Sequence, residues 1–125
     1  MKPIFQVILF FISVLIFAPQ SIQSQGLNRI IFFNLIPEEE SPEAVSFFKA
    51  TLSLGEISAL KDFQLLKVKS ENSEYEYFIN LVFEDQNQVE DYVKDPRHTN
   101  FLKEFWKSNV SDAKLIDLIE FLPED

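Results

Sequence analysis

The sequence predicts an α+β fold in which a four-stranded antiparallel sheet is covered on one face by two helices. Apolar stretches rich in Phe, Ile, Leu and Val, typical of strands, alternate with segments whose apolar residues recur at helical spacing. Two prolines mark helix starts, in Ser41-Pro42-Glu43 and in Asp95-Pro96. The resulting order, βαββαβ, is the split βαβ or ferredoxin-like pattern.

The first 24 residues differ in composition from the rest of the chain. Met1-Lys2 is a short basic start, and residues 4–17 are almost wholly apolar. This is the layout of a secretory signal peptide, and the apolar run is shorter than the ~20 residues that a membrane-spanning helix needs. We therefore predict a signal peptide over residues 1–24, cleaved after Ser24, and an exported domain over residues 25–125 that is periplasmic or secreted. The alternative is an uncleaved N-terminal anchor.

Charge and cysteine content exclude several classes of function. Loss of Lys2 with the signal peptide leaves 10 basic and 20 acidic side chains, a formal charge of −10. Nucleic acids and anionic membrane surfaces bind cationic patches, so neither is an expected partner after signal cleavage. The chain has no cysteine, which excludes a thiol nucleophile and a zinc–thiolate site. With a single histidine as well, we expect no metal ion and no cofactor.

Four segments are predicted as strands. Residues 28–36 form a near-continuous apolar run, as expected for a strand that is buried on both faces. Residues 63–69 and 75–83 are the next two, with a polar turn between them. Residues 113–121 are the fourth, after a loop at 109–112.

The helices have clear start signals. Ser41-Pro42-Glu43 supplies a hydroxyl N-cap, a proline at the first helical position and an acid near the positive helix end, and Gly55 lies at or just beyond the helix end. Asp85 can cap a short helix through Val89 and Tyr92. Asp95 can cap the helix that begins at Pro96 and carries an apolar stripe at helical spacing, namely His98, Phe101, Leu102, Phe105 and Trp106.

Strand parity predicts a homodimer. Two helices can cover only one face of a four-stranded sheet, yet the first, third and fourth strands have large apolar residues on both faces. The uncovered face would be a large apolar patch, which a twofold dimer would bury by closing two sheets face to face. The alternative is that a ligand, a tail or a loop covers that face.

These elements resemble the stress-responsive A/B barrel domain family, within the dimeric α+β barrel superfamily. The resemblance covers the whole mature chain. Its carriers, in order, are Arg29-Ile30-Ile31-Phe32-Phe33, Ser41-Pro42-Glu43, Leu81-Val82-Phe83-Glu84, the Y-x-x-x-P-x-H pattern within Val89 to His98, and Ile116-Asp117-Leu118-Ile119-Glu120-Phe121. The resemblance implies a homodimeric barrel of two sheets.

The same resemblance implies a candidate site. In a plant branch of the family, which consists of cofactor-free polyketide cyclases, a tyrosine and a histidine at the positions of Tyr92 and His98 take part in catalysis. That branch has further histidines on the first and third strands, where this sequence has Arg29 and Tyr77. The resemblance therefore leaves open whether this chain is an enzyme.

His98 and Tyr92 have two possible roles. In the catalytic role, the positive field of a helix N-terminus keeps His98 neutral, so that it acts as general base while Tyr92 serves as acid or oxyanion donor. In the structural role, a backbone carbonyl or Tyr92 satisfies the imidazole, which holds the turn; we favour this role because buried polar groups are normally hydrogen-bonded.

The predicted function is binding. We expect an exported homodimer that binds a small apolar or aromatic ligand in a pocket beside Tyr92 and His98. The alternative is a cofactor-free, polyketide-cyclase-like lyase. A third possibility is a purely structural dimer that is active in stress protection. Four further residues are candidates for ligand binding: Arg29, Tyr77, Phe101 and Trp106.

Overall fold

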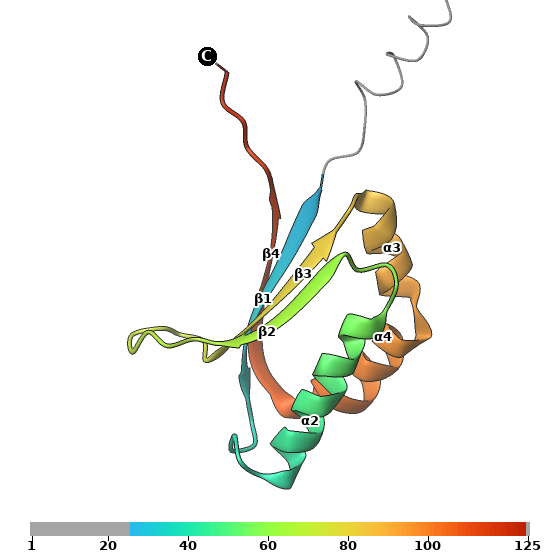
Figure 1. Cartoon of the computed structure of the whole chain (residues 1–125). Coiled ribbons are helices and arrows are strands. Elements are labelled where there is room, and N and C mark those ends of the chain that lie inside the picture. Colours follow the sequence, from blue (N-terminus) through green and yellow to red (C-terminus); the bar gives the residue numbers. More distant parts are fainter. Residues whose placement is uncertain (1–25, 125) are drawn as a thin grey trace, which may run out of the picture.

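The structure of the protein, a computed structural model, describes residues 26–124 and confirms the predicted α+β, ferredoxin-like class (Figure 1). The sheet order is β2-β3-β1-β4, with every neighbouring pair antiparallel. The predicted signal peptide lies outside the described residues. The elements are β1 (Leu27–Leu35), α2 (Pro42–Ser53), a 3₁₀ turn η1 (Leu54–Glu56), β2 (Asp62–Lys67), β3 (Tyr77–Phe83), α3 (Gln86–Lys94), α4 (Pro96–Phe101), a π-helical turn η2 (Leu102–Trp106), α5 (Lys107–Asn109) and β4 (Val110–Ile119).

The helices of residues 26–124 lie on one face of the sheet, as Figure 1 shows. The core lies between this face and the helices, and its largest fully buried side chains include Phe33, Phe47 and Phe83. Thr51, the polar residue in this core, donates its hydroxyl to the Phe47 carbonyl at 2.8 Å, so its burial leaves no unpaired group. Within residues 26–124, no helix has the length and apolar character needed to cross a membrane.

Each predicted helix start is confirmed by a side-chain cap. The Ser41 hydroxyl accepts a hydrogen bond from the Ala44 amide at 3.2 Å, and the Asp85 carboxylate accepts one from Gln88 at 3.0 Å. The Asp95 carboxylate accepts one from the Arg97 amide at 2.8 Å. These caps satisfy amide groups that have no partner within their own helix.

Two predicted strand starts were wrong by more than one residue. Residues 109–112 are not a loop, because β4 already begins at Val110, opposite Leu35 of β1. The polar sequence there suggested a turn, but the segment pairs with β1 as far as Val110, and an irregularity between Asn34 and Leu35 accommodates the register shift. The third strand begins at Tyr77, so Tyr75 is not in it; the Tyr75 ring lies 5.9 Å from the Phe32 ring.

The face opposite the helices is open and largely apolar in the single chain. Leu66 and Leu118 on this face are 46% and 50% exposed. Around them lie the partly buried side chains of Phe32, Phe78 and Ile116. A row of amides crosses the same face, in which Asn28 donates to Asn80 at 3.3 Å and Asn80 donates to Gln64 at 3.4 Å.

Candidate functional site

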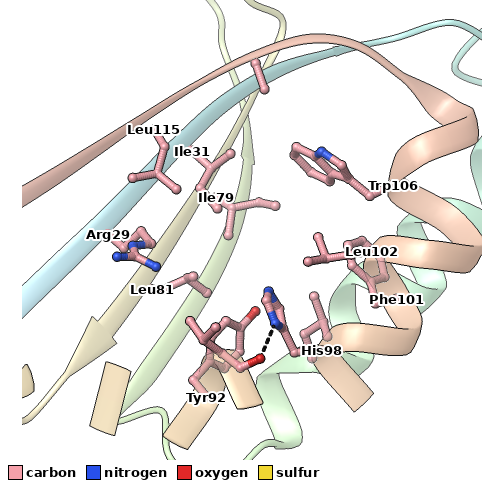
Figure 2. Close-up of a pocket in the computed structure, with 13 residues that line it drawn as sticks. Arg29, Ile31, Ile79, Leu81, Tyr92, His98, Phe101, Leu102, Trp106 and Leu115 are labelled. Atoms are coloured by element: carbon pink, nitrogen blue, oxygen red, sulfur yellow. Dashed lines mark hydrogen bonds between the residues drawn. The ribbon is translucent and has the colours of Figure 1, made fainter. Parts of the chain in front are cut away.

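A cavity of about 400 Å³ lies between the helix-facing side of the sheet and the helical segment that contains α3, α4 and η2 (Figure 2). Its volume is within the range of small-molecule sites. Most of its wall is apolar, with a few polar side chains among the lining residues. The lining residues are Arg29, Ile31, Leu54, Ile79, Leu81, Tyr92, Val93, His98, Phe101, Leu102, Trp106, Ala113 and Leu115.

His98 lies in the first turn of α4 because Asp95 caps that helix and Pro96 starts it. Its Nδ1 is 3.1 Å from the carbonyl oxygen of Val93, the contact that is dashed in Figure 2. A carbonyl can only accept, so Nδ1 carries the proton and, in the neutral ring, Nε2 is an acceptor. Figure 2 shows the imidazole projecting into the cavity.

Burial lowers the pKa of His98 below its ordinary value, and the positive charge of Arg29 lowers it further. The Val93 hydrogen bond and the negative charge of Asp95 act in the opposite direction without reversing the shift. The imidazole is therefore neutral at pH 7, with an acceptor nitrogen available to a molecule in the cavity.

Tyr92 is the neighbour of His98 in the cavity wall. Its ring centroid is 4.5 Å from that of His98 and 5.6 Å from that of Phe83, and only 3% of the residue is exposed. Burial raises the pKa of its phenol, so the hydroxyl keeps its proton. Among residues 26–124 this hydroxyl has no hydrogen-bond partner, which leaves it free to donate to a bound molecule.

Arg29 contributes a positive charge to the strand side of the cavity. Its Nε donates to Oδ1 of Asp117 at 2.8 Å and its Nη2 donates to Oδ2 at 3.1 Å. The two residues are opposite each other in the β1–β4 pair. This bidentate contact raises the pKa of Arg29 and lowers that of Asp117, so both remain charged.

The structure places five of the six predicted site residues around one cavity: Tyr92, His98, Arg29, Phe101 and Trp106. Tyr77 is the exception, since it does not line the cavity. It is opposite Phe33 in the register, and its hydroxyl donates to Glu39 Oε1 at 2.9 Å. The predicted role of Tyr77 in ligand binding therefore stays a prediction, with no support from the lining of this cavity.

Sequence reasoning missed much of the apolar wall. The alternation of side chains along a strand could have identified Ile31, Ile79 and Leu81, because they share the helix-facing side of the sheet with Arg29. The π-helical turn had no sequence signal of this kind. In it, the amide of Lys107 reaches back five residues to the carbonyl of Leu102. The expected regular stripe thus contains one wider turn, a feature often found at functional sites.

No three His, Asp or Glu side chains in residues 26–124 gather closely enough to hold an ion.

Comparisons with known proteins place this geometry in a family. The model of the Stress responsive A/B Barrel Domain matches residues 27–120, whereas a comparison with curated proteins gives no match. Among solved structures, a Dabb family protein with a ferredoxin-like fold from Mesorhizobium loti has a TM-score of 0.70 and 24% identity, over 81% of this chain and 99% of that one.

Two further structures are similar. A dimeric protein with a ferredoxin-like fold from Bacteroides fragilis has a TM-score of 0.60 and 18% identity, over 76% of this chain and 96% of that one. The hydroxynitrile lyase from Passiflora edulis has a TM-score of 0.68 and 13% identity, over 80% of this chain and 99% of that one. At such identities these likenesses show the fold alone, whereas the family model spans most of the sequence: the chain belongs to the stress responsive A/B barrel domain family.

Proposed function

We propose that this protein is an exported homodimer whose cavity binds a small apolar or aromatic molecule. The observation that carries the proposal is the cavity itself, about 400 Å³ of largely apolar space in which Tyr92 and His98 offer polar atoms without partners. Such a combination orients a ligand through its polar end and gains affinity from burial of its apolar surface.

The polar atoms define what the ligand must carry. Nε2 of His98 accepts a hydrogen bond, whereas the protonated phenol of Tyr92 can donate one. A ligand with a hydroxyl or carbonyl group on an aromatic or branched apolar body satisfies both requirements. Phe101 and Trp106 supply aromatic surface on the helix side.

Trp106 provides a direct test, because it is the single tryptophan of the chain and it lines the cavity. We expect p-butylbenzyl alcohol to change its fluorescence in a saturable manner. Ala113→Phe, which fills the cavity from β4, should abolish this response. Ser111→Phe, on the same strand but outside the cavity, should preserve it, and equal binding by both variants would contradict the proposal.

The dimer is supported by the open sheet face and by similar structures that are themselves dimeric, from Bacteroides fragilis and Thermobifida fusca. Export rests on the composition of residues 1–24. Mass spectrometry of the protein expressed from the full sequence should find Gln25 at the N-terminus. A chain that still begins at Met1 in the cell extract would contradict export.

A second candidate function is lyase chemistry without a cofactor. It is favoured by the fixed tautomer of His98, whose Nδ1 is held by Val93 while Nε2 faces the cavity as a neutral base beside a phenol donor. The similar fold of a hydroxynitrile lyase suggests a cyanohydrin as the first substrate to test.

In that assay, Tyr92→Phe should abolish turnover and leave the melting temperature nearly unchanged. His98→Ala should also abolish turnover, with only a small decrease in melting temperature from loss of the Val93 hydrogen bond. If both variants instead melt early and the wild-type chain shows no turnover, the pair is structural and the lyase candidate fails.

A further inference from the structure

Arg29 is an unusual residue for its place in the fold. It lies in the middle of the sheet on the face that packs against the helices, where its neighbours in register on β1 and β3 include Ile31 and Leu81. A partly buried ion pair is costly to desolvate, and apolar residues of similar size are often as stable or more so. Stability of the sheet therefore gives little reason for the Arg29–Asp117 pair, and the cavity gives a better one.

The hydrogen bonds of Arg29 leave one edge of its guanidinium unused. Asp117 takes the edge formed by Nε and Nη2. The adjacent edge, formed by Nη1 and the second N–H of Nη2, has no hydrogen-bond partner among residues 26–124. Two parallel N–H groups at this spacing match the two oxygens of a carboxylate, a geometry that lysine lacks.

The guanidinium of Arg29 belongs to the cavity and not only to the surface. Arg29 is among the lining residues, whereas Asp117 is not, and the Arg29 side chain is 20% exposed against 39% for Asp117. Figure 2 shows Arg29 on the strand side of the cavity and Trp106 with Leu102 on the helix side. A molecule in the cavity thus meets a cation at one side and an aromatic surface at the other.

The acidic character of the chain does not cancel this local charge. The formal charge of the whole chain is −9. At physiological ionic strength, salt screens the field of solvent-exposed acids over a distance of roughly 8 Å. A carboxylate in contact with Arg29 would form charge-assisted hydrogen bonds in a partly desolvated site, which are worth more than that residual repulsion.

We propose that the ligand of this cavity is a small aromatic or aliphatic carboxylate, whose carboxylate binds the free edge of Arg29 while its apolar body packs against Trp106 and Leu115. This inference rests on the proposed binding function and adds the charge of the ligand to it. Asp117 is then a positioning residue that holds the guanidinium plane so that its free edge faces the cavity.

The test compares two probes that share one apolar body, p-butylbenzoate and p-butylbenzyl alcohol, through Trp106 fluorescence. In the wild-type protein the carboxylate should bind at least about tenfold more tightly, as expected for charge-assisted hydrogen bonds. Arg29→Gln should remove this preference, so that the ratio of the two affinities falls to about one whatever the change in the affinity for the alcohol. Asp117→Asn retains the cation and should retain a preference for the carboxylate.

The outcomes separate this inference from the proposed function. If the alcohol binds as tightly as the carboxylate in the wild type, or if the preference survives in Arg29→Gln, the carboxylate proposal is overturned and the cavity remains a binding site. If neither probe alters Trp106 fluorescence or the NMR signal of His98, both proposals fail. The double variant Arg29→Gln/Asp117→Asn leaves no unpaired charge, so it replaces the single variant if that one does not fold.

Discussion

At the level of single residues, the two ring nitrogens of His98 have different environments. Nδ1 is bonded to the Val93 carbonyl, which is the structural role expected from the sequence, and Nε2 has no partner among the described residues, which is what the chemical role requires. The two roles are therefore compatible in one ring, because the backbone contact that holds the turn also fixes the tautomer.

This environment predicts how His98 titrates. Burial and the charge of Arg29 lower its pKa, so the NMR signal of the single histidine should show a midpoint below the ordinary value of about 6.5. The histidine of the unfolded chain then binds a proton more readily than that of the folded chain. The free energy of unfolding therefore decreases as the pH falls from neutral through the pKa of the unfolded chain. In His98→Gln the melting temperature should depend less on pH between about pH 7.5 and about pH 5.5. A midpoint at or above 6.5 would contradict the burial of a neutral imidazole.

At the level of elements, the turn at Asp95 determines where His98 lies. The Asp95 carboxylate accepts from the Arg97 amide, and the His98 amide donates to the Asp95 carbonyl at 3.0 Å. Asp95→Ala should lower the melting temperature and weaken p-butylbenzyl alcohol binding, whereas Asp95→Asn keeps an acceptor and should be milder in both.

Asp85→Ala is the matched control for this prediction. It removes the cap of α3 and should cost about 1 kcal/mol of stability, as typical for an N-cap. Its effect on ligand binding should be small, because the turn that carries His98 keeps its own cap. Equal loss of binding in both cap variants would show that the weaker binding results from general destabilisation of the fold and not from the position of His98.

The elements also show what the sequence could and could not predict. Local signals located the helix starts, and thereby Tyr92 and His98, because a cap and a proline act within a few residues. Tyr77 lies outside the cavity for a tertiary reason. It pairs with Phe33, four residues from Arg29 along β1 and so roughly 13 Å away, where its hydroxyl donates to Glu39. The start of β4 at Val110 likewise depended on β1, which no local pattern reveals.

At the level of the whole molecule, the open sheet face remains the largest feature without a role in the single chain. Its exposed apolar side chains and its row of three amides have no helix above them (Figure 1). Face-to-face closure of two sheets would bury the apolar groups, and the amides of Asn28, Asn80 and Gln64 would favour one register because unpaired amides are costly to bury.

A charge on this face should therefore dissociate the dimer without unfolding the chain. Leu118 is 50% exposed in the single chain, so Leu118→Glu should fold, yet it would place a carboxylate against apolar groups in the closed dimer. Light scattering at micromolar concentration should report a dimer for the wild type and a monomer for this variant. Leu52→Glu is the matched control, since Leu52 is 55% exposed but lies on α2, away from the open face, and that variant should remain dimeric. A wild-type monomer, or a dimer that tolerates Leu118→Glu, would mean that the open face is not where two copies meet.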